Sequence, residues 1–149
     1  MLIGEYQHQF DDKSRISLPA KFRKEMGTDV VIAPGIDNCL FVFTATGWKE
    51  FTDRLSRSDN SSSVLQADNR TLNRLVIGRA VEVEVDSIGR MLIPEYLREY
   101  AGLESGKATI IGVVNRVEVW NADSWVAYRT EFSKKTDVIA DKLVSAGIV

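Results

Sequence analysis

The chain has 149 residues, of which 44% are hydrophobic and 27% charged, as expected for one compact domain or two small modules packed together. A single Cys and a single His exclude an intramolecular disulfide and a zinc site built from several such residues. Nineteen Lys and Arg against 21 Asp and Glu give a net charge of −2, which does not indicate a uniformly basic nucleic-acid binder.

The first half predicts a mixture of short strands and helices. Pro19 suits the first position of a helix of about two turns, and Gly27 suits its end. A turn is expected at 12–15 and an amphipathic helix at 48–55. The expected strands are Tyr6–Phe10, Ile16–Leu18, Val30–Ala33 and Leu40–Phe43.

The second half predicts the same elements in the same order. A polar segment at 59–63 precedes it, with a helix from Ser63 to Val76 that ends at Gly78. The alternation of apolar and charged residues from Ala80 to Val85 is typical of a half-buried strand. Further strands are expected at 91–93, 108–114 and 117–120, with helices after Pro94, at 125–132 and at 136–146.

An internal repeat accounts for this order. Thirteen residues from Asp11 align with thirteen from Asp86 at a shift of 75 (86 − 11), and four positions are identical, where chance gives about one. At a shift of 77 the alignment resumes. The matches are Asp11 with Asp86, Arg15 with Arg90, Pro19 with Pro94, Arg23 with Arg98, Gly35 with Gly112, Val42 with Val119 and Trp48 with Trp125. We therefore expect an intrachain duplication and a pseudo-twofold pair of modules.

Each copy contains an Asp-x-x-x-Arg turn. A carboxylate on one side of the turn can hold the Arg guanidinium by charge-assisted hydrogen bonds, and a held Arg is a good donor to guanine in the major groove. The stretch from Asp11 to Lys24 carries five basic and two acidic side chains, enough for local attraction to a polyanion. The spacing is equally compatible with two surface ion pairs that have no role in binding.

The residues that form these turns resemble a known family. The segments Asp11–Arg23 and Asp86–Arg98 are similar to the two signatures of the MraZ family of bacterial transcriptional regulators. The strand at 117–121 and Trp125 resemble the elements that follow in that family, and the resemblance covers nearly the whole chain.

The resemblance implies an α+β fold made of two SpoVT–AbrB-type modules of the swapped-hairpin kind, which interlock into a small pseudo-twofold β-barrel with helices outside it. The first module is expected at 5–52 and the second at 80–124, with a helical connector at 53–79 and C-terminal helices at 125–149. It implies ring-shaped homo-oligomers that bind short G-rich repeats in double-stranded DNA upstream of the division and cell-wall gene cluster. The expected DNA-binding residues are Asp11, Lys13, Arg15, Lys21, Arg23, Asp86, Arg90 and Arg98.

One difference between the two turns is visible in the sequence. Ser14 stands where the second copy has Gly89. Because Ser tolerates fewer backbone conformations than Gly, the first turn is expected to differ in shape from the second.

Two other classes of function remain open at this stage. An enzyme could use the paired carboxylates, but no nucleophile pair, metal cluster or cofactor loop accompanies them, and we expect no cofactor and no small-molecule substrate. An antitoxin-like interaction module is the second alternative. We expect His8 to be structural or to flank DNA, and Cys39 to be buried. No apolar run spans a membrane and no secretion signal is evident, so a cytoplasmic, nucleoid-associated location is predicted.

Overall fold

A computed structural model describes residues 1–56, 66–104 and 106–149. The fold is α+β, and every strand pair in these ranges is antiparallel. A larger sheet has the order β1-β7-β8-β4-β3-β5, and a second sheet pairs β2 with β6. The strands are β1 (Leu2–Gln9), β2 (Arg15–Ser17), β3 (Asp29–Pro34), β4 (Leu40–Thr44), β5 (Val81–Glu84), β6 (Arg90–Leu92), β7 (Lys107–Val114) and β8 (Val117–Asn121).

Helices follow the strands in both halves. Pro19 and Pro94 stand immediately before α1 and α4, as expected for a residue that starts a helix without needing its N–H. The helices are α1 (Ala20–Met26), α2 (Ala45–Ser56), α3 (Ala67–Leu72), the π-helical η2 (Asn73–Ile77), α4 (Glu95–Tyr100), α5 (Ala122–Ser133) and α6 (Thr136–Ser145).

Both halves contribute strands to each sheet, and the outer strands of the larger sheet are exchanged between them. β1 of the first half pairs with β7 of the second, and β5 of the second pairs with β3 of the first. At the centre of the larger sheet, Phe41 of β4 lies opposite Glu118 of β8. In the small sheet, Ile16 lies opposite Met91, its partner in the repeat. Neither half therefore completes a sheet without the other.

Most predicted elements are present within one to three residues of their expected ends, but three expectations need correction. β1 begins at Leu2 rather than Tyr6, because all eight of its residues pair with β7 although its polar residues conceal the strand pattern. The helix expected from Ser63 to Val76 is α3 followed by the π-helical η2, in which the N–H of Gly78 donates to the carbonyl of Asn73 at 3.0 Å. The first residues of that prediction, 63–65, lie outside the described residues.

The third correction concerns the repeat. Gly35 and Gly112 are not equivalent. The last pair before the loop of the first hairpin is Pro34 with Leu40, and that of the second is Gly112 with Val117, so Pro34 is the position equivalent to Gly112. The strands before the hairpin loop are related by a shift of 78 (112 − 34), and those after it by 77. The first copy thus has one extra residue in this loop.

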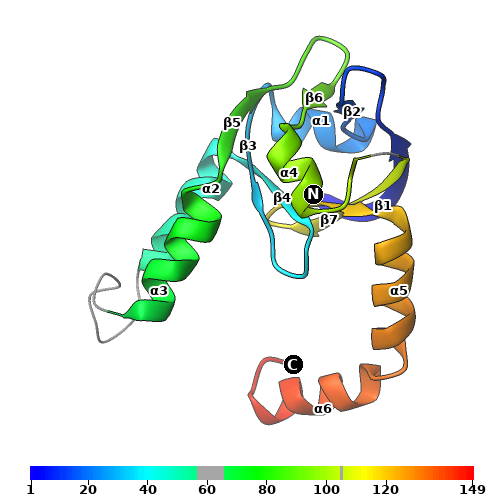
Figure 1. Ribbon diagram of the computed structural model, residues 1–149. Coiled ribbons are helices and arrows are strands. Elements are labelled where there is room, and N and C mark those ends of the chain that lie inside the picture. The colour runs from blue at the N-terminus through cyan, green and yellow to red at the C-terminus, as the bar shows by residue number, and fades with distance from the viewer. Residues whose placement is uncertain (57–65, 105) are drawn as a thin grey trace.

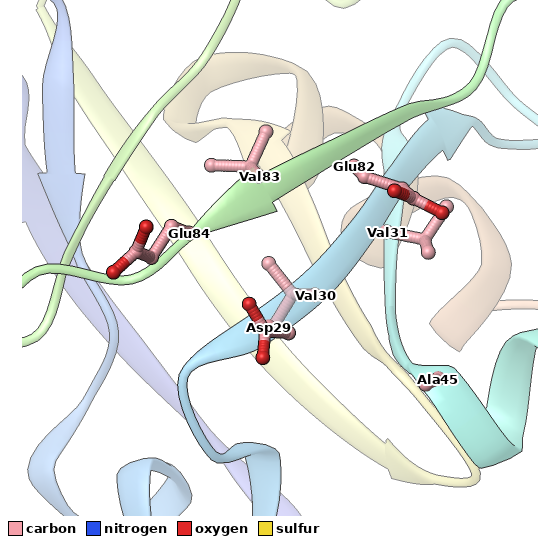
Figure 2. A pocket seen from close by; sticks show the side chains of 7 residues that line it. All are labelled: Asp29, Val30, Val31, Ala45, Glu82, Val83 and Glu84. Carbon is pink, nitrogen blue, oxygen red and sulfur yellow. The ribbon is translucent and has the colours of Figure 1, made fainter.

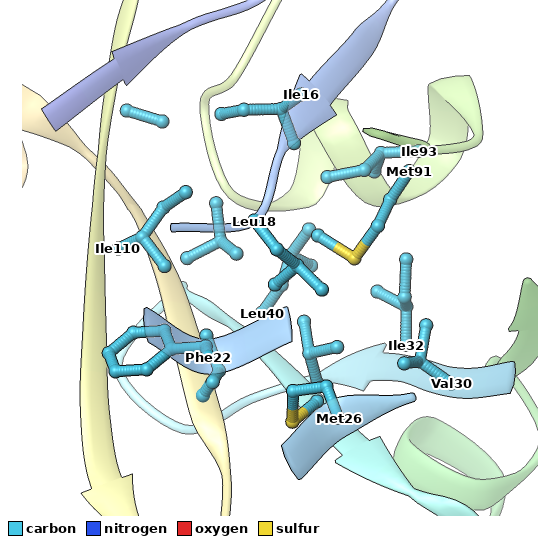
Figure 3. Packing of buried hydrophobic residues seen from close by; sticks show 14 of the residues in the cluster. Ile16, Leu18, Phe22, Met26, Val30, Ile32, Leu40, Met91, Ile93 and Ile110 are labelled. Carbon is cyan, nitrogen blue, oxygen red and sulfur yellow. The ribbon is translucent and has the colours of Figure 1, made fainter. Parts of the chain in front are cut away.

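The two faces of the larger sheet carry separate apolar clusters. One cluster lies between this sheet and the layer made by β2, β6, α1 and α4, and its labelled members in Figure 3 include Ile16, Phe22, Ile32 and Met91. The other cluster joins the opposite face to α2 and α5. It consists of Cys39, Phe41, Phe43, Ile111 and Trp120, with Trp48, Phe51, Trp125 and Tyr128 packed against it. The prediction that Cys39 is buried is confirmed.

The two turns and the outer helices lie at opposite ends of the molecule (Figure 1). The turn between β1 and β2 and the turn between β5 and β6 project side by side from one end, at the top of the view. Helices α2, α3, α5 and α6 extend from the other end. Within the described residues, no helix has both the length and the apolar character needed to cross a bilayer.

Candidate nucleic-acid interface

The first Asp-x-x-x-Arg turn is closed by its own aspartate. Oδ1 of Asp11 accepts the backbone N–H groups of Lys13 and Arg15, each at 2.9 Å. Its Oδ2 accepts Nε of Arg15 at 2.8 Å. One carboxylate therefore fixes both the backbone of the turn and the direction of the guanidinium.

The second turn repeats these contacts. Oδ1 of Asp86 accepts the N–H groups of Ile88 at 3.1 Å and Arg90 at 2.9 Å, and Oδ2 accepts Nε of Arg90 at 2.8 Å. Ser14 adopts a φ of 61°, close to the 86° of Gly89. The first turn was expected to differ in shape, but its hydrogen bonds match those of the second turn. The expectation is therefore wrong, because Ser14 adopts the left-handed conformation that was expected to need Gly.

The two turns form one unit. The carbonyl of Gly89 accepts the N–H of Leu18 at 2.8 Å, and the carbonyl of Ser14 accepts the N–H of Ile93 at 3.3 Å. Nη1 of Arg90 also lies 3.7 Å from Oδ2 of Asp11. Asp11 thus faces the guanidinium of its own turn and that of the other turn, a link that sequence reasoning missed because it depends on the pairing of β2 with β6.

Both guanidiniums remain accessible to a ligand. The Arg15 side chain is 28% exposed and that of Arg90 is 29% exposed. Since the bonds to Asp11 and Asp86 use Nε, the terminal nitrogens are the donors best placed to reach a further partner. A guanidinium held in this way loses little conformational freedom when it binds.

The carboxylates are ionised at neutral pH. The N–H of Arg15 lowers the pKa of Asp11 below its ordinary value, burial opposes this, and the guanidinium lowers it further. The pKa of Asp86 is lowered in the same way by Arg90. A lowered carboxyl pKa stabilises the fold at pH values above the ordinary Asp pKa, and that contribution is lost as the pH falls through the lowered pKa.

The other predicted residues lie in the first turn and in α1 and α4, the helices that follow β2 and β6. Lys13 and Lys21 are exposed, Lys13 in the first turn and Lys21 on α1. Nε of Arg23 donates to the carbonyl of Leu18 at 2.9 Å, and Nε of Arg98 donates to that of Ile93 at 3.0 Å. These two Arg side chains therefore brace the segment between strand and helix in each half, while their cationic heads add positive charge near the turns.

Two further contacts involve Arg23. Its side chain lies where a Cβ on Gly89 would be, so the first half packs directly on the second turn. Arg23 also lies near His8 of β1, whose pKa is lowered by burial and then by this positive charge. His8 therefore flanks the turns as an uncharged side chain at neutral pH.

The surface between β3 and β5 has the opposite character. A pocket of about 250 Å³ there is lined by Asp29, Glu82 and Glu84 together with apolar residues (Figure 2). Three carboxylates at this position repel a polyanion and make this surface an unfavourable place for one to bind. Among the described residues, no three His, Cys, Asp or Glu side chains are grouped so that they could hold a metal ion.

Comparisons with known proteins agree with the signatures in the turns. The family described as "MraZ protein, putative antitoxin-like" matches residues 1–74 and 76–143. A protein of Moorella thermoacetica is 41% identical over 99% of this chain and 100% of its own length. Proteins of Caldicellulosiruptor bescii and Acetivibrio thermocellus show the same identity and coverage, and all three are named transcriptional regulator MraZ rather than as enzymes. The chain belongs to the MraZ family.

Proposed function

We propose that the protein is a sequence-specific DNA-binding transcriptional regulator, and that the paired turns are its DNA-reading surface. The observation that carries this proposal is the pair of Asp-held Arg side chains on the two-stranded β2–β6 sheet. A two-stranded antiparallel ribbon fits the major groove of B-form DNA, and a fixed guanidinium can donate two hydrogen bonds to O6 and N7 of guanine.

The remaining basic residues suit contacts with the DNA backbone. Cations in or near a reading surface supply affinity without reading sequence, and the candidates are Lys13 in the first turn, Arg23 against the second turn, and Lys21 and Arg98 on the helices that follow. With a net charge of −2 for the whole chain, binding depends on this local surface.

The wider proposal follows the family resemblance. The two halves would be duplicated swapped-hairpin modules that close into a small barrel, which the exchange of β1 and β5 between the halves supports. Several copies would assemble and bind G-rich promoter repeats upstream of the division and cell-wall genes at the nucleoid. An antitoxin-like interaction module is the alternative. We favour DNA because the turns present two partly exposed guanidiniums, each held in a fixed direction by an aspartate and able to donate to guanine in the major groove.

The decisive experiment removes the two guanidiniums. Arg15→Ala and Arg90→Ala should each weaken binding to DNA from upstream of the protein's own gene by about 1–3 kcal/mol for each guanine that is no longer read. Binding is measured by gel-shift titration at several salt concentrations against a scrambled duplex. The matched control is Arg54→Ala, which removes an exposed Arg from α2 at the other end of the molecule. Parental affinity in both single variants and the double variant would place the binding site elsewhere.

A further inference from the structure

The two turns share their backbone geometry but present different side chains. By the repeat, Lys13 of the first turn corresponds to Ile88 of the second, since 88 − 13 is 75. Ser17 on β2 likewise corresponds to Leu92 on β6. At both positions a polar side chain of the first half is replaced by a branched apolar one in the second.

Both apolar side chains are unusually accessible. Ile88 is 57% exposed and Leu92 is 54% exposed, whereas Met91 between Arg90 and Leu92 is completely buried. Successive strand residues point to opposite faces, so Leu92 shares the outer face of the small sheet with Arg90. In the register of this sheet Leu92 lies directly opposite Arg15. Leu92 and the guanidiniums therefore occupy one surface, and Ile88 is exposed in the turn that leads into it.

We infer that Ile88 and Leu92 read thymine by contacting its C5-methyl group, beside the guanines read by Arg15 and Arg90. This inference rests on the proposed DNA-binding function. The major groove is the one place on DNA where guanine acceptors and a methyl group stand next to each other on base edges. A protein partner would have to bury the neighbouring guanidiniums, with a cost in desolvation.

The placement gives the binding site a direction. Only the second half contributes exposed apolar side chains to this surface, because Lys13 and Ser17 occupy the equivalent places in the first half. A pseudo-twofold backbone therefore reads a sequence that is not a palindrome, with thymine adjacent to the second turn.

The test removes the methyl group from DNA without changing the protein. The probe is the bound upstream duplex, made with thymine and again with deoxyuridine at every thymine position. Removal of one contacted methyl should weaken binding about fourfold, the value of one buried methylene group. Because the wild-type protein is used, this result does not depend on whether a variant folds.

Two variants then assign the effect to residues. Ile88→Lys and Leu92→Ser give the second half the side chains of the first, and both sites are exposed enough for the thermal midpoint to be retained. Each should bring the ratio of the two dissociation constants, deoxyuridine over thymine duplex, toward 1. The matched control Ile36→Ser removes an apolar side chain that is 63% exposed in the loop between β3 and β4, away from the β2–β6 sheet, and should leave the ratio at its wild-type value.

The outcomes separate this inference from the function on which it rests. A wild-type protein that binds its duplex specifically but shows equal affinity for both duplexes overturns the thymine contact and leaves the DNA-binding function standing. The thymine contact is also overturned if the ratio of the two dissociation constants stays at its wild-type value in both Ile88→Lys and Leu92→Ser. Absence of any specific binding by the wild-type protein would defeat the proposed function itself.

Discussion

At the scale of single residues, the two aspartates are not equivalent although their turns are. Oδ2 of Asp11 lies 2.8 Å from Nε of Arg15 and 3.7 Å from Nη1 of Arg90, whereas Asp86 holds the guanidinium of Arg90 in its own turn. Asp11→Asn should therefore weaken DNA binding more than Asp86→Asn, by about twofold to fivefold. Titrations at low and moderate salt measure the difference. Equal effects in the two variants would mean that the link between the turns does not contribute.

Ser14 and Gly89 show how the same backbone turn is reached with different residues. Gly89→Ser places a side chain at a φ of 86° and pushes its Cβ into the side chain of Arg23, so it should destabilise the fold by about 1–2 kcal/mol. Ser14→Gly relieves a left-handed Ser, and the greater flexibility of Gly in the unfolded chain offsets part of the gain. We expect this second change to be neutral or to stabilise by up to about 1 kcal/mol. Urea unfolding of both variants distinguishes these signs, and destabilisation of equal size would refute the argument.

At the scale of elements, a charged cluster holds the centre of the larger sheet. Glu118 of β8 is 8% exposed, and its carboxylate accepts Nη2 of Arg116 at 2.6 Å and Nε1 of Trp120 at 3.1 Å. The Arg116 guanidinium also lies 4.3 Å from the centre of the Phe41 ring. The ring contact joins Arg116 of the second half to β4 of the first, beside one of the strand pairs that link the two halves.

Removal of this carboxylate should be costly. Glu118→Ala removes the acceptor of Nε and Nη2 of Arg116 and of the Trp120 N–H, and we expect a decrease of about 3 kcal/mol in the free energy of unfolding. The matched control is Glu131→Ala on α5, which breaks an exposed pair with Lys135 in the following turn and should cost less than about 1 kcal/mol. Urea unfolding at neutral pH measures both, and similar costs would show that the central cluster is not important for stability.

Sequence patterns predicted a helix or strand well where residues close in sequence determine its bounds. The alternation from Ala80 to Val85 and the prolines before α1 and α4 placed strands and helices close to their observed ends. They failed at β1, whose extent is set by β7 about a hundred residues away. The candidate site was likewise predictable only where residues close in sequence form it. The repeat revealed each Asp-x-x-x-Arg turn, but the link from Arg90 to Asp11 and the shared outer face of Arg15 and Leu92 depend on strand pairing between the halves.

At the scale of the whole molecule, the candidate DNA surface and a second, apolar surface lie at opposite ends (Figure 1). A groove of about 390 Å³ between α5 and α6 is lined mainly by apolar side chains, among them Trp125, Phe132 and Leu143. Ile139 in this groove is 39% exposed. Exposed apolar surface of this kind is typical of an interaction site, and a neighbour that covered it would leave the turns uncovered.

Assembly through this apolar surface should determine how DNA is bound. Leu143→Glu places a charge in the groove and should reduce the assembly size measured by analytical ultracentrifugation, while the turns stay intact. One copy presents only two turns, so DNA with one repeat should bind weakly to either form. DNA with several repeats should bind far more tightly to the parent, because linked sites raise the effective concentration. Moving the repeats by half a helical turn should remove that gain, since adjacent turns would meet opposite faces of the duplex. A parent protein that stays monomeric, or that binds one repeat as tightly as several, would contradict this account.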